Sequence, residues 1–199
     1  MNEEGIIKYN CTWIKQDPLD SIWIKELNIW RNKLYRANLI GVNKEGIGYG
    51  NISARFRDNT FIITGSTTGK LKKLTGKHYT LVTDYDLNEN RVTTQGPIIA
   101  SSESLTHAII YECAGNINAV MHVHHLKLWK KLVDTLPSTN KHIEYGTTAL
   151  AREIKRLFKK SGLTKQKIFA MGGHEEGIIS FGKNFAEAGQ EIFDRLIFL

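Results

Sequence analysis

Two histidines in a short apolar stretch could together hold a metal ion. They lie in Met121-His122-Val123-His124, a run that is typical of a β-strand. Because side chains alternate between the two faces of a strand, His122 and His124 point the same way and can bind one ion from a rigid platform. Imidazole suits zinc, and a catalytic zinc site holds three protein ligands and leaves a position open for water or substrate. Histidine pairs are common in strands without any metal, so the hypothesis needs a third ligand.

His174 is the best candidate for that third ligand. It lies between Met171 and Gly177, in a glycine-bounded turn that joins two predicted strands. Functional residues concentrate in loops that a rigid scaffold holds in place. The alternative for His174 is an ordinary turn histidine. Spacing alone leaves three other histidines as competitors: His78, His107 and His142.

A carboxylate beside this strand could take part in the chemistry. Glu103 directly follows Ser101 and Ser102, in the first turn of a predicted helix. Unpaired backbone N–H groups and the helix dipole favour negative charge there by about 0.3 to 1 kcal/mol. A plain helix cap is the alternative interpretation. Glu103, His107 and Tyr111 follow one another at steps of four, so they form one stripe on the helix.

Three segments offer neutral hydroxyl groups and backbone N–H donors that suit a phosphate. They are the turn Gly50-Asn51, the loop Gly65-Ser66-Thr67-Thr68-Gly69 and the helix start Ser101-Ser102. The GxxxxGK[ST] pattern of a P-loop is absent from the sequence. Each segment alone is typical of a simple turn, and the three gain weight together with the metal candidates.

The chain is basic, with a formal net charge of +7 and a pI near 9.3. This charge favours anionic partners, either nucleic acid or phosphorylated small molecules. The densest clusters are short, such as Lys70 to Lys73, and an ordinary solvated basic surface explains them. A reading helix and an aromatic stacking platform are both lacking, so we expect no nucleic-acid partner.

The N-terminal residues and the cysteines bear on the cellular compartment. Glu3 and Glu4 stand where a secretory signal would carry basic residues, and no apolar run approaches the roughly 18 to 20 residues that cross a bilayer. Cys11 and Cys113 lie far apart without a CxxC spacing, which favours two buried thiols over a disulfide framework. We expect a cytoplasmic protein without a membrane partner.

The hydrophobic periodicity predicts one domain of α/β class. At 199 residues with 41% hydrophobic residues, a single core over residues 1–199 is the natural expectation, with 1–19 as an N-terminal extension. Helices are predicted after the cap Asp20-Ser21 to near Gly41, after Ser101-Ser102 through Cys113, at 147–160 and at 185–196. Strands are predicted at 48–56, 60–64, 79–83, 91–94, 118–124, 167–171 and 177–181. Hairpins and helices alternate without a regular βαβ repeat, which indicates a mixed or mainly antiparallel sheet covered by helices.

These segments, in this order, resemble the class II aldolase and adducin family, in its short, fuculose-phosphate aldolase-like form. The most specific match is Ser101-Ser102-Glu103 with His107 and Tyr111, followed by the run from Asn118 to His124. Gly50-Asn51-Ile52-Ser53 and the stretch from Ile63 to Thr75 are similar to the family's phosphate-binding segments. Gly173-His174 through Gly182 is similar to its third-ligand hairpin. The resemblance covers roughly residues 20 to 198.

The resemblance implies a three-layer α/β/α sandwich with a mixed, mainly antiparallel central sheet, and a homo-oligomer, with a tetramer favoured. It implies that His122, His124 and His174 hold Zn²⁺ or another divalent transition metal, and that Glu103 is the acid/base or an exchangeable fourth ligand. The implied phosphate ligands are Asn51, Thr67 or Thr68, Gly69, Ser101 and Ser102. The threonine loop is one residue longer than the family pattern, so Thr67, Thr68 and Gly69 keep alternative alignments.

Two further departures from the family pattern concern the chemistry. The segment between His124 and the helix at 147–160 is short, and in the aldolases it carries a tyrosine offered to the neighbouring subunit. Tyr145 is only a loose substitute. Glu175 and Glu176 also stand where relatives place glycine directly after the histidine.

We therefore expect a metal-dependent lyase that cleaves a small sugar phosphate or related hydroxy-carbonyl compound through a metal-stabilised enediolate. Epimerase, dehydratase and decarboxylase activities share this chemistry and stay as alternatives, since fold and site do not separate them. A non-catalytic adducin-like domain for binding or assembly is the rival from another class. The presence of Glu103 and three histidines argues against that rival, because a scaffold would not require them.

Overall fold

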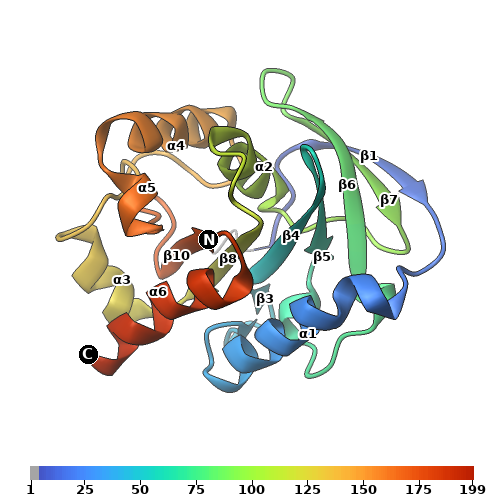
Figure 1. The fold of residues 1–199 in the computed structure, drawn as a ribbon, viewed down its shortest axis with the longest axis horizontal. Helices are drawn as coiled ribbons and strands as arrows, with labels where there is room; N and C mark the ends of the chain where they lie inside the picture. The colour runs from blue at the N-terminus through green and yellow to red at the C-terminus, as the bar shows by residue number, and fades with distance from the viewer. Residues whose placement is uncertain (1–4) are drawn as a thin grey trace.

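The computed structural model describes residues 5–199, which form an eight-stranded sheet with helices on both faces (Figure 1). Neighbouring strands are antiparallel except β1 and β7, which run parallel. The sheet is therefore mixed and mainly antiparallel, as predicted. In spatial order its strands are β1 (Asn10–Lys15), β7 (Arg91–Gly96), β6 (Tyr79–Asp86), β5 (Thr60–Thr64), β4 (Asn51–Arg57), β8 (Ala119–His124), β10 (Gly177–Gly182) and β9 (Ile168–Ala170). A separate pair consists of β2 (Gly41–Val42) and β3 (Gly48–Tyr49).

Six α-helices lie in the part of the chain that the structure describes. They are α1 (Ser21–Arg36), α2 (Ser104–Cys113), α3 (Leu126–Val133), α4 (Thr148–Lys160), α5 (Leu163–Gln166) and α6 (Phe185–Ile197). Side chains of α2, α4 and α5 pack in one hydrophobic cluster, and those of α1, α3 and α6 pack in a second. Within residues 5–199, no helix combines the length and the apolar character that a bilayer span requires.

The sheet separates these two clusters, and strand alternation distributes its side chains between them. On β8, Val120 belongs to the cluster with α2 and α4, whereas Met121 and Val123 belong to the cluster with α1 and α6. Burial of apolar surface on both faces stabilises the sheet. The three-layer α/β/α arrangement predicted from the resemblance is confirmed.

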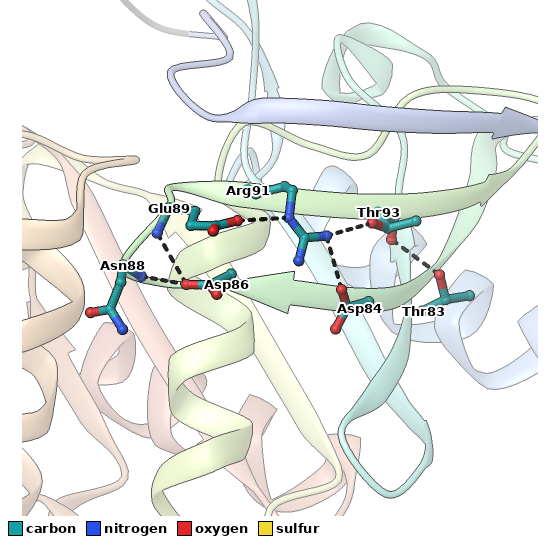
Figure 2. A network of polar contacts seen from close by, with 7 residues as sticks. All are labelled: Thr83, Asp84, Asp86, Asn88, Glu89, Arg91 and Thr93. Atoms are coloured by element: carbon teal, nitrogen blue, oxygen red, sulfur yellow. Dashed lines mark hydrogen bonds and ion pairs between the residues drawn. The ribbon is translucent and has the colours of Figure 1, made fainter.

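The hairpin of β6 and β7 shows how local polar contacts fix a register (Figure 2). Asp86 accepts hydrogen bonds from the backbone N–H groups of Asn88 at 2.8 Å and Glu89 at 3.0 Å, which closes the turn. Arg91 donates to Asp84 at 2.9 Å and to Glu89 at 3.4 Å. The predicted strand pair is present and extends to the turn. β7, the second strand of this hairpin, pairs with β1.

Four of the strands and α-helices were not predicted from the sequence: β1, β2, α3 and α5. β1 lies inside the expected extension 1–19, of which residues 1–4 lie outside the described part, and it joins the main sheet as an edge strand. Residues 10–15 are thus part of the domain's sheet. The segment expected to be short after His124 contains α3, whose residues Leu128 and Leu132 are buried against the sheet.

Arg31 connects α1 to the loop that follows β5. The side chain is 1% exposed, and its guanidinium donates to the carbonyl oxygens of Gly69 at 2.9 Å, Thr68 at 3.2 Å and Lys72 at 3.2 Å. It also lies over the ring of Tyr35, with 4.5 Å between Cζ and the ring centroid. One buried cation therefore satisfies three carbonyl groups and holds the loop against the helix.

We expect Arg31→Met to lower the free energy of unfolding by on the order of 3 kcal/mol, because it removes the side-chain donor from buried carbonyl groups, of which Thr68 keeps only its bond from Leu71. Urea unfolding followed by circular dichroism measures the change. Arg36→Met, which alters an exposed arginine at the end of the same helix, is the matched control and should change stability by less than about 0.5 kcal/mol. Equal effects of the two substitutions would contradict the role of Arg31.

Candidate active site

His122 and His124 lie on β8, an interior strand on which every residue is buried. β4 and β10 flank it, with His122 opposite Asn51 on one side and Ile179 on the other. The two histidines have the same strand parity as Val120, so they face the α2 and α4 side of the sheet. The predicted strand places both imidazoles on one face.

His174 reaches the same place from the turn between β9 and β10. Its backbone N–H donates to the Met171 carbonyl at 3.1 Å, and its own carbonyl accepts from Gly177 at 2.9 Å. A Cβ at Gly172 would collide with the carbonyl oxygen of Thr139, and one at Gly173 with that of Ile143. Only glycines allow the turn to pack this closely against the backbone of Thr139 and Ile143. Gly172 and Gly173 therefore fix the orientation of His174, which follows them.

The three histidines form one cluster of possible metal ligands. One ligand atom of each lies within 4.8 Å of the other two, and the Nε2 atoms of His124 and His174 are 3.1 Å apart. All three side chains are buried, from 0% exposed at His122 to 9% at His174. Among the described residues, no other histidine, cysteine or acid belongs to this cluster.

Burial keeps these imidazoles in the neutral form. It lowers the pKa of His122 and His124 well below the ordinary value, and the neighbouring histidines lower it further. Burial, with a smaller effect of the Lys8 charge, lowers the pKa of His174 to about 4. Neutral imidazole is the form that binds metal, because a protonated ring has no lone pair to donate. The Nε2 atom of His122 is buried without a hydrogen-bond partner among the described residues, so the donor set fits a divalent transition metal.

Glu103 is the residue directly before α2, one position earlier than the first turn predicted from the sequence. Its side chain is 2% exposed, and Oε2 accepts a hydrogen bond from the Thr106 hydroxyl at 2.6 Å. Oε1 is buried without a partner in the described part of the chain. Burial raises the pKa of Glu103 to about 7, against the opposing effects of Thr106 and Lys8. The carboxyl group can therefore accept or release a proton near neutral pH.

A small polar cavity brings together all the residues predicted to bind phosphate. Asn51, Thr67, Thr68, Gly69, Ser101 and Ser102 line it, with glycines of the adjacent loops. Thr67 adopts a left-handed conformation with φ of 59°, and Thr68 donates its hydroxyl to the Gly65 carbonyl at 2.7 Å. A Cβ at Gly69 would collide with the carbonyl oxygen of Tyr49, so the loop requires glycine there. Gly5 also lines the cavity, and sequence reasoning missed it.

A larger cavity of about 850 Å³ opens beside the histidine cluster. Tyr49 stacks on His124 with ring centroids 5.1 Å apart, and Tyr145 lies against His174 at 4.7 Å. Lys8 also lines this cavity, with its Nζ 2.9 Å from a carboxylate oxygen of Glu144 and 4.6 Å from the Tyr145 ring centroid. Lys8 and Tyr49 were missed at the level of sequence, since neither stands in a motif that signals chemistry.

The remaining histidine candidates lie elsewhere. His107 is buried, and its Nδ1 is 2.7 Å from the Ser53 hydroxyl, which is also 2.7 Å from the Tyr111 hydroxyl. The predicted stripe of Glu103, His107 and Tyr111 thus faces the interior, where Ser53 links its last two members. The Nδ1 of His78 accepts from the backbone of Thr75 at 2.9 Å, and His142 is exposed.

Comparison with solved structures finds the same fold in several sugar-phosphate enzymes. L-fuculose 1-phosphate aldolase aligns with a TM-score of 0.66 and 18% identity, over 91% of this chain and 86% of that one. L-fuculose-1-phosphate aldolase from Thermus thermophilus aligns at 0.62 and 18%, over 90% and 93%. A sugar-phosphate aldolase from Thermotoga maritima aligns at 0.64 and 15%, over 87% and 90%. At these identities the likeness establishes the fold.

The family follows from the sequence itself. No curated protein matches the chain. The sequence model described as class II aldolase and adducin N-terminal domain matches residues 44–193, which include every histidine of the cluster, Glu103 and the lining residues of the small polar cavity from Gly48 onward. The chain therefore belongs to the class II aldolase and adducin N-terminal domain family.

Proposed function

We propose that this protein is a metal-dependent lyase of the aldolase type, which cleaves a carbon–carbon bond in a small sugar phosphate or a related hydroxy-carbonyl compound. The observation that carries the proposal is the meeting of three buried, neutral imidazoles, His122, His124 and His174, at one point. Membership of the aldolase and adducin family supports it.

The three histidines would hold one divalent cation, with zinc preferred because imidazole nitrogen suits it. When bound, such a cation acts as a Lewis acid that polarises the oxygens of a hydroxy-carbonyl compound and stabilises negative charge there by several kcal/mol. The chain's contribution is a fixed donor set. β8 orients two imidazoles by strand alternation, and the packed glycine turn orients the third.

Glu103 would act as the acid/base. A group whose pKa lies near ambient pH is suited to both directions of proton transfer, and burial brings the pKa of Glu103 to about 7. Thr106 holds one oxygen at 2.6 Å, which orients the carboxyl group and leaves Oε1 to exchange the proton. A bound cation nearby would lower the pKa and favour the carboxylate, the form that removes a proton.

The small polar cavity would receive the phosphate group. Among its lining residues, Thr67, Thr68, Ser101 and Ser102 carry hydroxyls, Asn51 carries an amide and Gly69 a backbone N–H, groups that suit a phosphate without a direct charge. The larger cavity of about 850 Å³ would hold the rest of a small sugar. The similar solved structures named for L-fuculose 1-phosphate make that compound the first substrate to test.

The same residues would serve an epimerase, a dehydratase or a decarboxylase, since each needs charge stabilisation at a carbonyl oxygen and a positioned acid/base. YgbL from Klebsiella pneumoniae, a candidate aldolase, epimerase or decarboxylase, aligns with 18% identity over 89% of each chain and a TM-score of 0.64. Aldol cleavage is our first choice, and these reactions are the alternatives.

The proposed assembly is a homo-oligomer, with a tetramer favoured. Exposed Ile22, Trp23 and Ile29 on α1 offer apolar surface for such contacts.

The metal hypothesis predicts about one divalent ion per chain in protein purified without added zinc. Replacing two ligands in a His122→Ala, His124→Ala double variant should abolish binding, and His174→Ala should weaken it strongly, because each removes donors from a three-ligand set. Metal analysis by inductively coupled plasma mass spectrometry measures the content. His142→Ala, which removes an exposed histidine outside the cluster, should retain the ion. Loss of metal from that control alone would refute the assignment.

The acid/base assignment predicts that Glu103→Gln lowers kcat by about 10²- to 10⁴-fold, because the amide cannot transfer the proton. The metal content should stay near the wild-type value, since Glu103 lies outside the three-histidine cluster. Aldehyde release from L-fuculose 1-phosphate, or from a panel of ketose 1-phosphates, provides the rate. A Gln variant with wild-type kcat would exclude Glu103 from the chemistry.

The raised pKa of Glu103 also predicts how metal-free protein responds to pH. Between the ordinary value of 4.5 and about 7, the folded chain keeps a proton that the unfolded chain has lost. This stabilisation is complete below pH 4.5 and is lost as pH rises to about 7. The difference between the two pKa values corresponds to roughly 3 kcal/mol in the free energy of unfolding.

Glu103→Gln lacks this group, so the free energy of unfolding of wild type relative to the variant should fall by up to that amount from about pH 4.5 to about pH 8. The buried histidines titrate in both proteins, so their opposite contribution cancels in the difference. Urea unfolding of chelator-treated protein measures it. A difference independent of pH would contradict the buried, protonated state of Glu103.

A further inference from the structure

Asn51 touches both halves of the site. It is the first residue of β4, opposite His122 in the register with β8, and it is 6% exposed. Its Nδ2 lies 3.2 Å from the Nδ1 of His122. The same side chain lines the small polar cavity with the loops at Gly48 and Gly69 and the helix start at Ser101. One amide group thus separates a metal-ligand candidate from the cavity suited to an anion.

Two buried atoms beside this contact have no hydrogen-bond partner among the described residues. They are the Oδ1 of Asn51 and the Nε2 of His122. With Nδ2 facing the imidazole, the amide donates and Nδ1 must accept. A neutral imidazole carries its proton on the other nitrogen, so this arrangement protonates Nε2. The arrangement therefore removes the lone pair from Nε2, the ring nitrogen that does not contact Asn51.

Metal binding at Nε2 requires the opposite tautomer. The ring proton must then lie on Nδ1, where it needs an acceptor, because a ligating histidine donates its second N–H to a partner that fixes the ring. His122 is fully buried, and Asn51 is the residue at Nδ1. A half-turn of the amide about the Cβ–Cγ bond exchanges its oxygen and nitrogen and supplies that acceptor without moving the backbone.

The same half-turn moves the NH₂ group to the position that Oδ1 occupies. No hydrogen-bond donor among the described residues reaches Oδ1 at that position, so the turned NH₂ group is placed to donate to an acceptor that enters the cavity. The cavity beside Asn51 is lined by glycines and by the hydroxyl-bearing residues Ser66, Thr67, Thr68, Ser101 and Ser102. An oxyanion such as phosphate accepts hydrogen bonds from all of these donors, including the turned amide.

We propose that Asn51 couples the metal site to the anion cavity, because its carbonyl oxygen fixes the metal-binding tautomer of His122 while its NH₂ group binds a phosphate oxygen. A metal ion and a phosphate select the same amide orientation, so each increases the affinity of the other by the same factor. This inference rests on the proposed function. It adds that a phosphorylated substrate strengthens the binding of the metal on which its reaction depends.

The test is the zinc affinity of the chelator-treated full chain, measured by competition with a chromophoric chelator with and without inorganic phosphate. Wild type should bind zinc about tenfold more tightly in phosphate. Asn51→Ala should lower the zinc affinity without phosphate by about 10- to 100-fold, as loss of a partner to a ligating histidine does, and should abolish the effect of phosphate. Circular dichroism verifies that each variant is folded.

Asn51→Asp separates the two roles. A carboxylate accepts the Nδ1 proton of His122, so zinc affinity without phosphate should stay within a few-fold of wild type. It cannot donate to phosphate and repels it, so the phosphate effect should disappear. His142→Ala, which removes an exposed histidine outside the cluster, is the control and should leave both the phosphate-free zinc affinity and the effect of phosphate unchanged.

A second readout follows the tautomer directly. In protein labelled with ¹⁵N-histidine, NMR should place the proton of His122 on Nε2 without metal and on Nδ1 with zinc, whereas in Asn51→Asp it should lie on Nδ1 in both states. Equal phosphate effects in wild type and Asn51→Ala would overturn the coupling while leaving the metal site intact. The coupling is equally overturned if zinc binds wild type with full stoichiometry and phosphate changes nothing. Absence of zinc binding by wild type would instead refute the proposed function, and the coupling with it.

Discussion

The burial of two imidazoles on an interior strand is the constraint on which the site depends. β8 lies between β4 and β10, so its backbone is paired on both sides and its side chains have only two faces to occupy. A buried polar nitrogen without a partner is costly. Asn51 contacts one nitrogen of His122, and ligand nitrogens of the three histidines lie within 4.8 Å of one another. This spacing is close enough for one cation to bind all three.

Two loops complete the site, and backbone packing holds each of them. Gly172 and Gly173 press the turn of His174 against the carbonyl groups of residues 139 and 143. Arg31 donates to the carbonyl oxygens of the loop at Thr68 and Gly69, and the Thr68 hydroxyl donates to the Gly65 carbonyl within the same loop. Both loops are therefore held on a rigid support, which is where functional side chains concentrate.

The sequence pattern alone predicted the positions of residues correctly where a single helix or strand places them. The cap at Asp20 begins α1 as predicted, since its side chain accepts from Ile22, and the period of two placed His122 and His124 on one face. The position of Glu103 was predicted within one residue. Its bond to Thr106 is local, three residues along the chain, whereas its burial depends on tertiary packing that no local pattern records. β1 was missed for the same reason, because a parallel edge strand takes its register from β7 and not from its own alternation.

The N-terminal segment shows where this chain can differ from its family. The family match begins at residue 44, yet Gly5 lines the small polar cavity and Lys8 lines the larger one. Tyr9 donates to the carbonyl oxygen of Ser101 at 3.0 Å, which ties this segment to the start of α2 beside Glu103. Lys8 lies over the ring of Tyr145, which in turn contacts His174. The three histidines and Glu103 lie within the family match, whereas Gly5 and Lys8 precede it. The walls of both cavities are therefore built partly by a segment outside the match, so substitutions there can change the shape of either cavity without altering the histidines or Glu103.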